Sequence, residues 1–110
     1  MNKIQKMNNE KEIYEEFEIL RSIDKNPNTT QRELANDLGF SLGKLNYCLK
    51  ALKIKGYVKI QNFQKKKNKI AAIQYILTHK GIAERTKLTI NFMSRKMKEY
   101  DALKKELRDN

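Results

Sequence analysis

The stretch TQRELANDLGFSLGKLNYCLKALKIKGYV, residues 30–58, carries the clearest folding pattern in the chain. It opens with Thr30 and, three positions later, Glu33, which is the spacing of a capping box at the start of a helix. Gly39 favours the end of this short helix, because glycine readily takes the left-handed conformation of a helix C-cap. Ser41 is a good N-cap for a second helix. Two helices joined by a short turn that contains glycine are typical of a helix-turn-helix motif.

Apolar residues recur at helical spacing in both helices, so each helix has one face that is expected in a core. The residues of these faces are Leu34, Ala35 and Leu38 on the shorter helix and Leu45, Leu49 and Leu52 on the longer one. The residues of the longer helix that lie off its stripe include Lys44, Tyr47, Lys50 and Lys53. The longer helix, which Gly56 is suited to end, therefore keeps a polar and basic surface for solvent or a partner.

A further helix is expected before this motif, over residues 10–24. Its apolar residues at helical spacing are Ile13, Phe17, Leu20 and Ile23, with Tyr14 alongside. Pro27 ends this helix, because proline disfavours helical geometry in the residue before it. Residues 1–9 are polar and are expected to form a flexible tail.

The pattern changes after the motif. Two runs rich in β-forming residues, 57–63 and 70–77, predict a pair of strands. The polar segment between them, residues 64–69, predicts a hairpin connection with a basic tip. Thr78 is a suitable cap for a final long helix that runs to about Arg108.

The order of these elements, helix, helix, turn, helix and hairpin, is that of a winged helix-turn-helix. The fold class is therefore expected to be mainly α with a small β-hairpin wing. The winged helix-turn-helix is expected over residues 10–78, and a long C-terminal dimerisation helix over residues 79–110. A chain of 110 residues is long enough to bury one core.

Positive charge is concentrated in residues 41–80, which hold ten lysines and no aspartate or glutamate. This block supplies +10 of the formal charge of +11 of the whole chain. Such a block favours a polyanionic partner, because neutralising phosphates releases condensed counterions. The alternative is that the lysines only keep an exposed surface soluble, but acidic residues would then be expected among them.

In a winged helix-turn-helix the helix after the turn enters the major groove of DNA, and its N-terminal residues reach base edges. Lysine binds phosphate or guanine, and asparagine pairs bidentately with adenine. Asn46 could equally face a neighbouring helix, which the sequence leaves open. The residues expected to contact double-stranded DNA are Ser41, Gly43, Lys44, Asn46, Tyr47 and Lys50 on this helix and Lys65, Lys66, Lys67 and Lys69 at the hairpin tip.

A distinctive string, SLGKLNYCLKAL at residues 41–52, resembles the MarR-type winged-helix regulators associated with bacterial exopolysaccharide loci. The resemblance extends over roughly residues 12 to 107. Its other segments are QRELA (31–35), KGYVK (55–59), NF (62–63), LT (77–78), KGI (80–82), LT (88–89) and RKMKEY (95–100). It implies a sequence-specific transcription regulator that controls exopolysaccharide genes.

Two positions depart from the family pattern. His79 stands where a proline is expected after Leu-Thr. The hairpin tip has lysines in place of the aspartate-arginine pair of larger MarR proteins. Lysine binds phosphate but lacks the planar fork of arginine, so insertion of arginine into the minor groove is not expected here.

The C-terminal helix has a heptad-like seam with spacings of four and three over residues 89–107. The expected dimerisation residues on this seam are Met93, Tyr100, Leu103 and Leu107. A homodimer would match a palindromic operator with half-sites about one helical turn apart. The alternative is a single helix folded across its own domain. Ile82, Leu88 and Phe92 are expected to pack onto that domain.

Other classes of function find little support. The sequence holds no metal-ligand constellation, nucleophile elbow or glycine-rich cofactor loop, so neither an enzyme nor a cofactor is expected. Its one cysteine, Cys48, and the absence of a long apolar run indicate a protein of the reducing cytoplasm, with no membrane partner. A small-molecule effector is not expected, because the chain lacks much of the N-terminal helical region that helps to form the pocket of larger MarR proteins. The alternative function is an RNA-binding or protein-assembly module that uses the basic surface.

Overall fold

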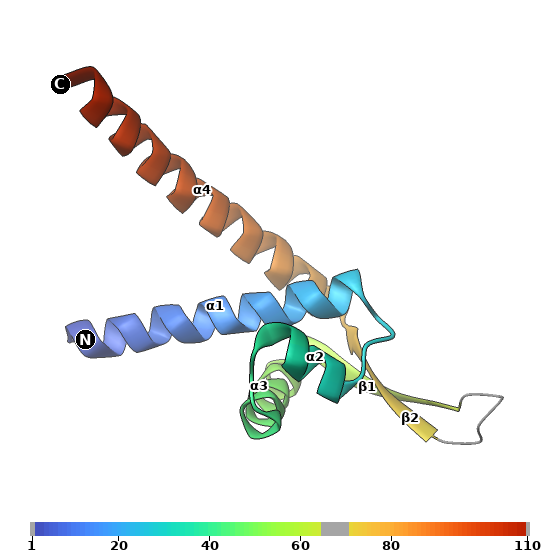
Figure 1. Cartoon of the computed structure of the whole chain (residues 1–110). Helices are drawn as coiled ribbons and strands as arrows, with labels where there is room; N and C mark the ends of the chain where they lie inside the picture. Colours follow the sequence, from blue (N-terminus) through green and yellow to red (C-terminus); the bar gives the residue numbers. More distant parts are fainter. Residues whose placement is uncertain (1, 65–70, 110) are drawn as a thin grey trace.

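The computed structural model describes residues 2–64 and 71–109, and side chains of residues 62–73 lie outside the described ones. In chain order its elements are α1 (Lys3–Lys25), α2 (Gln31–Leu38), α3 (Leu42–Ile54), β1 (Val58–Gln64), β2 (Ala71–Leu77) and α4 (His79–Asp109). Figure 1 shows α1 and α4 projecting to one side of the molecule and the hairpin to the other. This is the winged helix-turn-helix with a long C-terminal helix that the sequence predicts.

The first helix is longer than expected, because α1 begins at Lys3 rather than at residue 10. The Asn2 side chain accepts a hydrogen bond from the backbone N–H of Gln5 at 2.8 Å. The Gln5 side chain in turn accepts from the backbone N–H of Asn2 at 3.4 Å, which completes a capping box. The segment expected as a flexible tail therefore continues the helix from its third residue. Its C-terminal end at Lys25, just before Asn26 and Pro27, agrees with the prediction within two residues.

The turn between α2 and α3 follows the predicted pattern. Thr30 and Glu33 form the capping box of α2, in which the Thr30 hydroxyl accepts from the backbone N–H of Glu33 at 3.1 Å. Gly39 ends α2 with φ of 70°, a left-handed conformation that a side chain would disfavour. The Ser41 hydroxyl then accepts from the backbone N–H of Lys44 at 3.1 Å and caps α3. These local interactions set the sharp change of direction between the two helices.

The end of α3 is closed by Gly56, which has φ of 81°. The backbone N–H of Tyr57 donates to the carbonyl of Leu52 at 3.0 Å, and that of Gly56 donates to the carbonyl of Lys53 at 3.0 Å. This pair of bonds is a Schellman motif, which satisfies carbonyls that the helix leaves without partners. It also directs the chain from α3 straight into β1.

The two strands form an antiparallel hairpin in which Val58 pairs with Leu77 and Ile60 with Tyr75. Each strand begins one residue later than the sequence predicts. The expected basic tip of the hairpin, with Lys65, Lys66, Lys67 and Lys69, lies outside the described residues.

The core lies between α1, α2, α3 and the base of the hairpin. The predicted stripe of α3 is confirmed, since Leu45, Leu49 and Leu52 are all buried. The other buried hydrophobic residues are Phe17, Ile19, Leu20 and Ile23 of α1, Leu34 and Ala35 of α2, Val58 and Tyr75 of the hairpin, and Leu88 of α4.

Only the first part of α4 packs on this core. Leu88 is buried, and the Phe92 ring lies 5.0 Å from that of Phe17 and 5.6 Å from that of Tyr14. The prediction that Ile82 also packs here is wrong, since Ile82 is 49% exposed. Six helical positions separate it from Leu88, which turns it about 120° around the helix axis.

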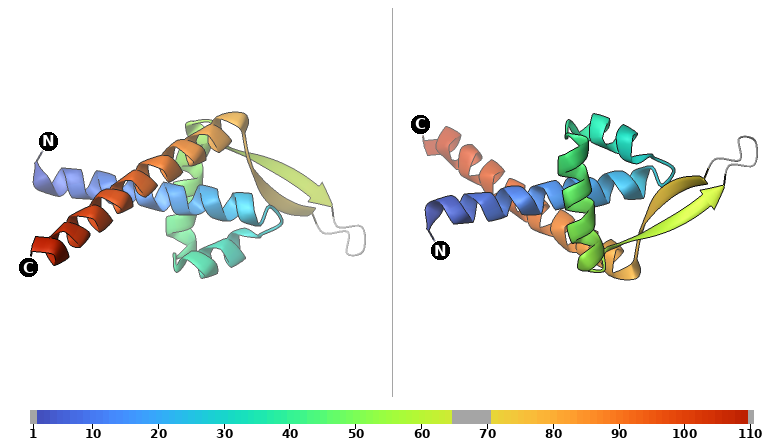
Figure 2. Two further views of the ribbon diagram at one scale, coloured as in Figure 1. Left: turned by 90° about the horizontal axis from the view of Figure 1, so that it is seen from above. Right: turned by 90° about the horizontal axis from the view of Figure 1, so that it is seen from below.

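Beyond Phe92, α4 extends away from the domain, and the molecule reaches 65 Å in its longest dimension. Figure 2 shows α4 crossing over α1, with the ends of both helices standing clear of the domain. Within residues 2–64 and 71–109, none of the helices is long and apolar enough to cross a membrane.

Candidate nucleic-acid interface

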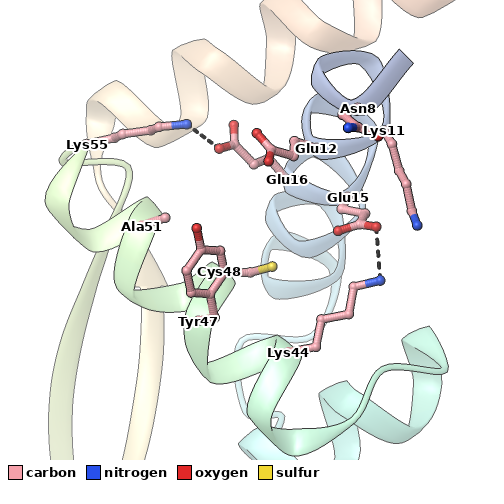
Figure 3. Close-up of a pocket in the computed structure, with 10 residues that line it drawn as sticks. All are labelled: Asn8, Lys11, Glu12, Glu15, Glu16, Lys44, Tyr47, Cys48, Ala51 and Lys55. Carbon is pink, nitrogen blue, oxygen red and sulfur yellow. Dashed lines mark hydrogen bonds and ion pairs between the residues drawn. The ribbon is translucent and has the colours of Figure 1, made fainter. Parts of the chain in front are cut away.

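α3 presents three distinct faces. Its core face holds the three buried leucines. Its second face holds Lys44, Cys48, Ala51 and Lys55, which line a groove beside α1 (Figure 3). Its third face is open and holds Gly43, Asn46, Lys50 and Ile54, with Tyr47 at its border with the groove. The open face is the part of α3 that a partner molecule can reach.

Most of the predicted DNA-contacting residues of α3 lie on or beside this open face. Asn46 is exposed, so its side chain is not packed against a neighbouring helix, which settles the alternative that the sequence left open. Tyr47 is 74% exposed, and Lys50 and Ser41 are exposed as well. A side chain added at Gly43 would meet nothing within 4 Å, so the surface is open there.

The N-terminal end of α3 is electrostatically suited to an anion. Its first turn holds no acidic residue. The unpaired N–H groups and the positive end of the helix dipole therefore keep their attraction for a negative group. The hydroxyl of the N-cap residue Ser41 accepts a hydrogen bond from one of these N–H groups, that of Lys44.

Lys44 differs from the other predicted residues, because its side chain turns toward α1. The Lys44 ammonium nitrogen lies 2.9 Å from a carboxylate oxygen of Glu15. It also lies 4.3 Å from the centroid of the Phe40 ring, within the range of a cation–π interaction. Lys44 is thus held on the flank of α3 and not on its open face.

A second ion pair joins the other end of α3 to α1. Lys55 donates a hydrogen bond to the carboxylate of Glu16, and this bond is the main cause that raises the pKa of Lys55. The side chains of Glu15 and Glu16 are only 15% and 17% exposed. Sequence reasoning did not find these two contacts. The signal that could have found them is the spacing of Glu12, Glu15 and Glu16 at i, i+3 and i+4, which places three carboxylates on one side of the helix.

The groove between α1 and α3 has a volume of about 580 Å³ and is lined mainly by charged side chains. Burial raises the pKa of the Cys48 thiol, and the negative charge of Glu15 raises it further, while Lys44 acts in the opposite direction. A redox-sensing cysteine would need a lowered pKa instead. Cys48 is partly buried and packs against the core, as a structural cysteine does.

The base of the hairpin is fixed to the helix-turn-helix by two side chains of β2. The Tyr75 hydroxyl donates to the side-chain carbonyl of Gln31, 3.2 Å away in the first turn of α2. The Gln74 amide donates to the backbone carbonyl of Pro27 at 2.6 Å and to the side-chain oxygen of Asn28 at 3.4 Å. These contacts hold the described part of the hairpin beside the start of α2, and sequence reasoning did not find them.

The predicted dimerisation residues of α4 are all solvent-exposed in the single chain. A row of large apolar side chains runs along the projecting part of this helix. Its members are Ile90, Met93, Met97, Tyr100, Leu103 and Leu107, each at least 58% exposed. The N-terminal half of α1 exposes a second row, made of Ile4, Met7 and Tyr14.

Comparisons with known proteins agree with this architecture. Residues 16–59 match a family model described as a winged helix-turn-helix DNA-binding domain. The chain is similar to Staphylococcus aureus MarR in complex with salicylate and kanamycin, with a TM-score of 0.62 and 23% identity. That match covers 83% of this chain and 57% of the other, so this chain spans less than two thirds of the length of that MarR. The sequence shows no significant match to a curated protein.

Two further similar structures are complexes with DNA. Streptococcus pneumoniae FabT bound to DNA has a TM-score of 0.56 and 22% identity, over 86% of this chain and 70% of that one. The S. aureus MepR–DNA complex has a TM-score of 0.60 and 17% identity, over 86% of this chain and 73% of that one. At these identities the likeness shows a shared winged-helix fold.

Proposed function

We propose that this protein is a transcription regulator that binds double-stranded DNA, and that it acts as a homodimer on a palindromic operator. The observation that carries the proposal is the open face of α3, where Asn46 and Lys50 are exposed beside Tyr47 and no acidic residue lies nearby in sequence. The match of residues 16–59 to a DNA-binding domain supports it. So does the fold shared with FabT and MepR, which were solved as DNA complexes.

The arrangement of α3 and the hairpin suits a DNA duplex. Figure 1 shows both on the side of α1 opposite to α4, so one duplex can face the two elements together. The open face of α3 would enter the major groove, where asparagine reads adenine and lysine reads guanine. The ten lysines of residues 41–80 supply the charge for phosphate contacts.

The homodimer is proposed from the exposed apolar rows on α4 and α1. Leu88 and Phe92 already use one face of α4 for its own domain. The exposed row continues along α4 from Ile90 to Leu107, and no other part of the described chain covers it. A second copy of the chain would bury both rows and would place two α3 helices in two-fold symmetry, as a palindrome requires.

Double-stranded DNA is favoured over RNA by the shape of the reading element. α3 spans 13 residues and is open along one side, which fits the wide major groove of B-DNA. The major groove of A-form RNA is too narrow for side chains to read. The further proposal that the target genes belong to an exopolysaccharide locus rests only on the sequence resemblance over roughly residues 12 to 107.

Competition binding tests the proposal. A fluorescent DNA duplex of random sequence is bound at low salt, and unlabelled duplex DNA and duplex RNA of the same length compete for the protein. We expect DNA to compete more strongly than RNA, and we expect Lys50→Ala to weaken binding more than the control Lys98→Ala on α4. Equal competition by RNA, together with equal effects of both substitutions, would contradict a DNA-reading α3.

A further inference from the structure

We propose that Glu15 and Glu16 of α1 are positioning residues that determine which spacing of operator half-sites the dimer accepts. The inference rests on the proposed function, because it concerns how two copies of α3 are placed on one duplex. It assigns to two acidic residues of α1 a part in DNA selectivity that does not require them to contact DNA.

The two carboxylates hold α3 at both of its ends. Lys44 lies in the first turn of α3 and pairs with Glu15 at 2.9 Å, while Lys55 is the C-cap residue and pairs with Glu16. Eleven helical positions separate the two lysines, which corresponds to about 16 Å along the axis. Neighbouring residues on α1 diverge by about 100°, so Glu15 and Glu16 can reach opposite ends of the helix beside them. Figure 3 shows the two ion pairs diverging in this way.

These pairs bridge a gap that packing does not fill. The groove of about 580 Å³ lies between α1 and this flank of α3, and both pairs span it. On its other side α3 is seated in the core through its leucine stripe. A helix held along one seam can still rock about that seam, and two ion pairs on its flank oppose the rocking. Because both glutamates are largely buried, these pairs are screened by solvent less than pairs of fully exposed side chains.

The orientation of α3 relative to α1 matters in a dimer. The N-terminal part of α1 carries the exposed residues Ile4 and Met7, which would face the proposed partner, and the same helix carries the core residues Phe17 and Leu20. It therefore connects the dimer interface to the DNA-reading helix. A change in the angle between α1 and α3 changes the separation of the two reading helices, which must match half-sites about one helical turn apart.

The experiment uses the full-length protein and a set of palindromic duplexes. The half-site is the one that the wild-type protein enriches from random DNA, and the spacer between half-sites is varied in single base-pair steps. The test variant is Glu15→Gln with Glu16→Gln. The control variant is Glu10→Gln with Glu18→Gln, which makes the same change in charge on α1; Glu18 pairs with Arg21 of the same helix. The Kd for each spacer is divided by the Kd for the best spacer, so that a general gain in affinity from the added charge cancels.

We expect the wild-type and control proteins to bind the best spacer about tenfold more tightly than its neighbours, a loss comparable to that of one mismatched base pair. The Glu15→Gln, Glu16→Gln variant should bind neighbouring spacers nearly as well as the best one. Glu16→Lys alone should weaken the preference for the best spacer. The exchange Glu16→Lys with Lys55→Glu restores one ion pair with reversed charges and should restore part of that preference.

The outcomes separate the two proposals. A spacer profile that is the same in the wild-type and in the Glu15→Gln, Glu16→Gln variant would overturn the positioning role and leave the proposed function intact. A wild-type protein that enriches no two-fold site at all would instead contradict the proposed function. Thermal unfolding of each variant shows that the comparison is made between folded proteins.

Discussion

The Tyr75 hydroxyl donates a hydrogen bond to the Gln31 side chain across 3.2 Å, and this bond joins the hairpin to the first turn of α2. Tyr75 itself is buried, so its hydroxyl has little access to water. We expect Tyr75→Phe to keep the packing of the ring and to lower the free energy of unfolding by about 1 kcal/mol, the net contribution of one hydrogen bond. Urea unfolding measures the change. Tyr47→Phe is the control, because Tyr47 is 74% exposed, and an equal loss in both variants would contradict the expectation.

Tyr75 is also expected to affect how the free energy of unfolding changes at alkaline pH. Burial raises the pKa of Tyr75 above its ordinary value of 10.0. Between the pKa of the unfolded chain and the raised pKa of the folded one, the folded state binds more protons, so stability falls as pH rises. We expect Tyr75→Phe to lose less stability than the wild-type protein when the pH is raised above 10, measured by urea unfolding at several pH values. Parallel losses in the two proteins would show that Tyr75 does not contribute.

The thiol of Cys48 reports on the Glu15–Lys44 ion pair. The negative charge of Glu15 helps to raise the pKa of Cys48, and the positive charge of Lys44 opposes it. Replacing Glu15 by Gln removes the first effect and leaves the second, so the pKa falls and more thiolate is present. We expect faster alkylation of Cys48 by iodoacetamide at about pH 8, close to the ordinary titration range of a thiol. Glu18→Gln should leave the rate unchanged, and an unchanged or slower rate in Glu15→Gln would be evidence against the pair.

Gly81 is required by the close approach of α4 to the start of β1. A methyl group at this position would overlap the backbone carbonyl oxygen of Tyr57. We expect Gly81→Ala to lower the free energy of unfolding by about 3 kcal/mol, as for severe overpacking. Gly43→Ala is the matched control, because nothing lies within 4 Å of the new methyl group. It should raise stability by less than about 1 kcal/mol, since alanine favours helical geometry over glycine and Gly43 lies in the first turn of α3, where this preference is weaker than in a helix interior. Similar thermal unfolding of the two variants would mean that α4 shifts readily away from Tyr57.

The exposed seam of α4 predicts how the dimer can be broken. Leu103→Asp with Leu107→Asp places two charges in the proposed interface and should give monomers in sedimentation experiments, because burying an unpaired charge is costly. The domain should stay folded, since both side chains are at least 62% exposed in the single chain. Lys98→Gln with Lys105→Gln, which also lowers the net charge by two, is a control for the change in charge. If the Leu103→Asp, Leu107→Asp variant still forms dimers, the interface lies at other residues.

Local sequence signals predicted most of the fold. The caps at Thr30 and Ser41 and the glycine at Gly39 act through neighbours a few positions away, so their effect can be read from spacing. The leucine stripe of α3 follows from helical periodicity in the same way. The early start of α1 depends on a capping box as well, but Asn2 and Gln5 form it within a segment that looks polar and unstructured.

The candidate site was only partly predictable. The exposure of Tyr47 and Lys50 agrees with their place off the apolar stripe, whereas the sequence left the direction of Asn46 open. The direction of Lys44 was not predictable, because its partner Glu15 lies far away in sequence and becomes a neighbour only when α1 packs beside α3. The exposure of Ile82 shows the same limit, since an apolar residue in a helix packs only if its face meets another element.

DNA selection tests the proposed function most directly. The protein is mixed with a random library of DNA duplexes, at about 0.15 M salt so that non-specific contacts are weakened, with an excess of non-specific competitor. A homodimeric regulator that reads bases with the open face of α3 should enrich a palindrome, and Asn46→Ala should relax the preference at one base position of each half-site. Tight, salt-sensitive binding without any enriched sequence would contradict the proposal and would identify the basic surface as a non-specific one.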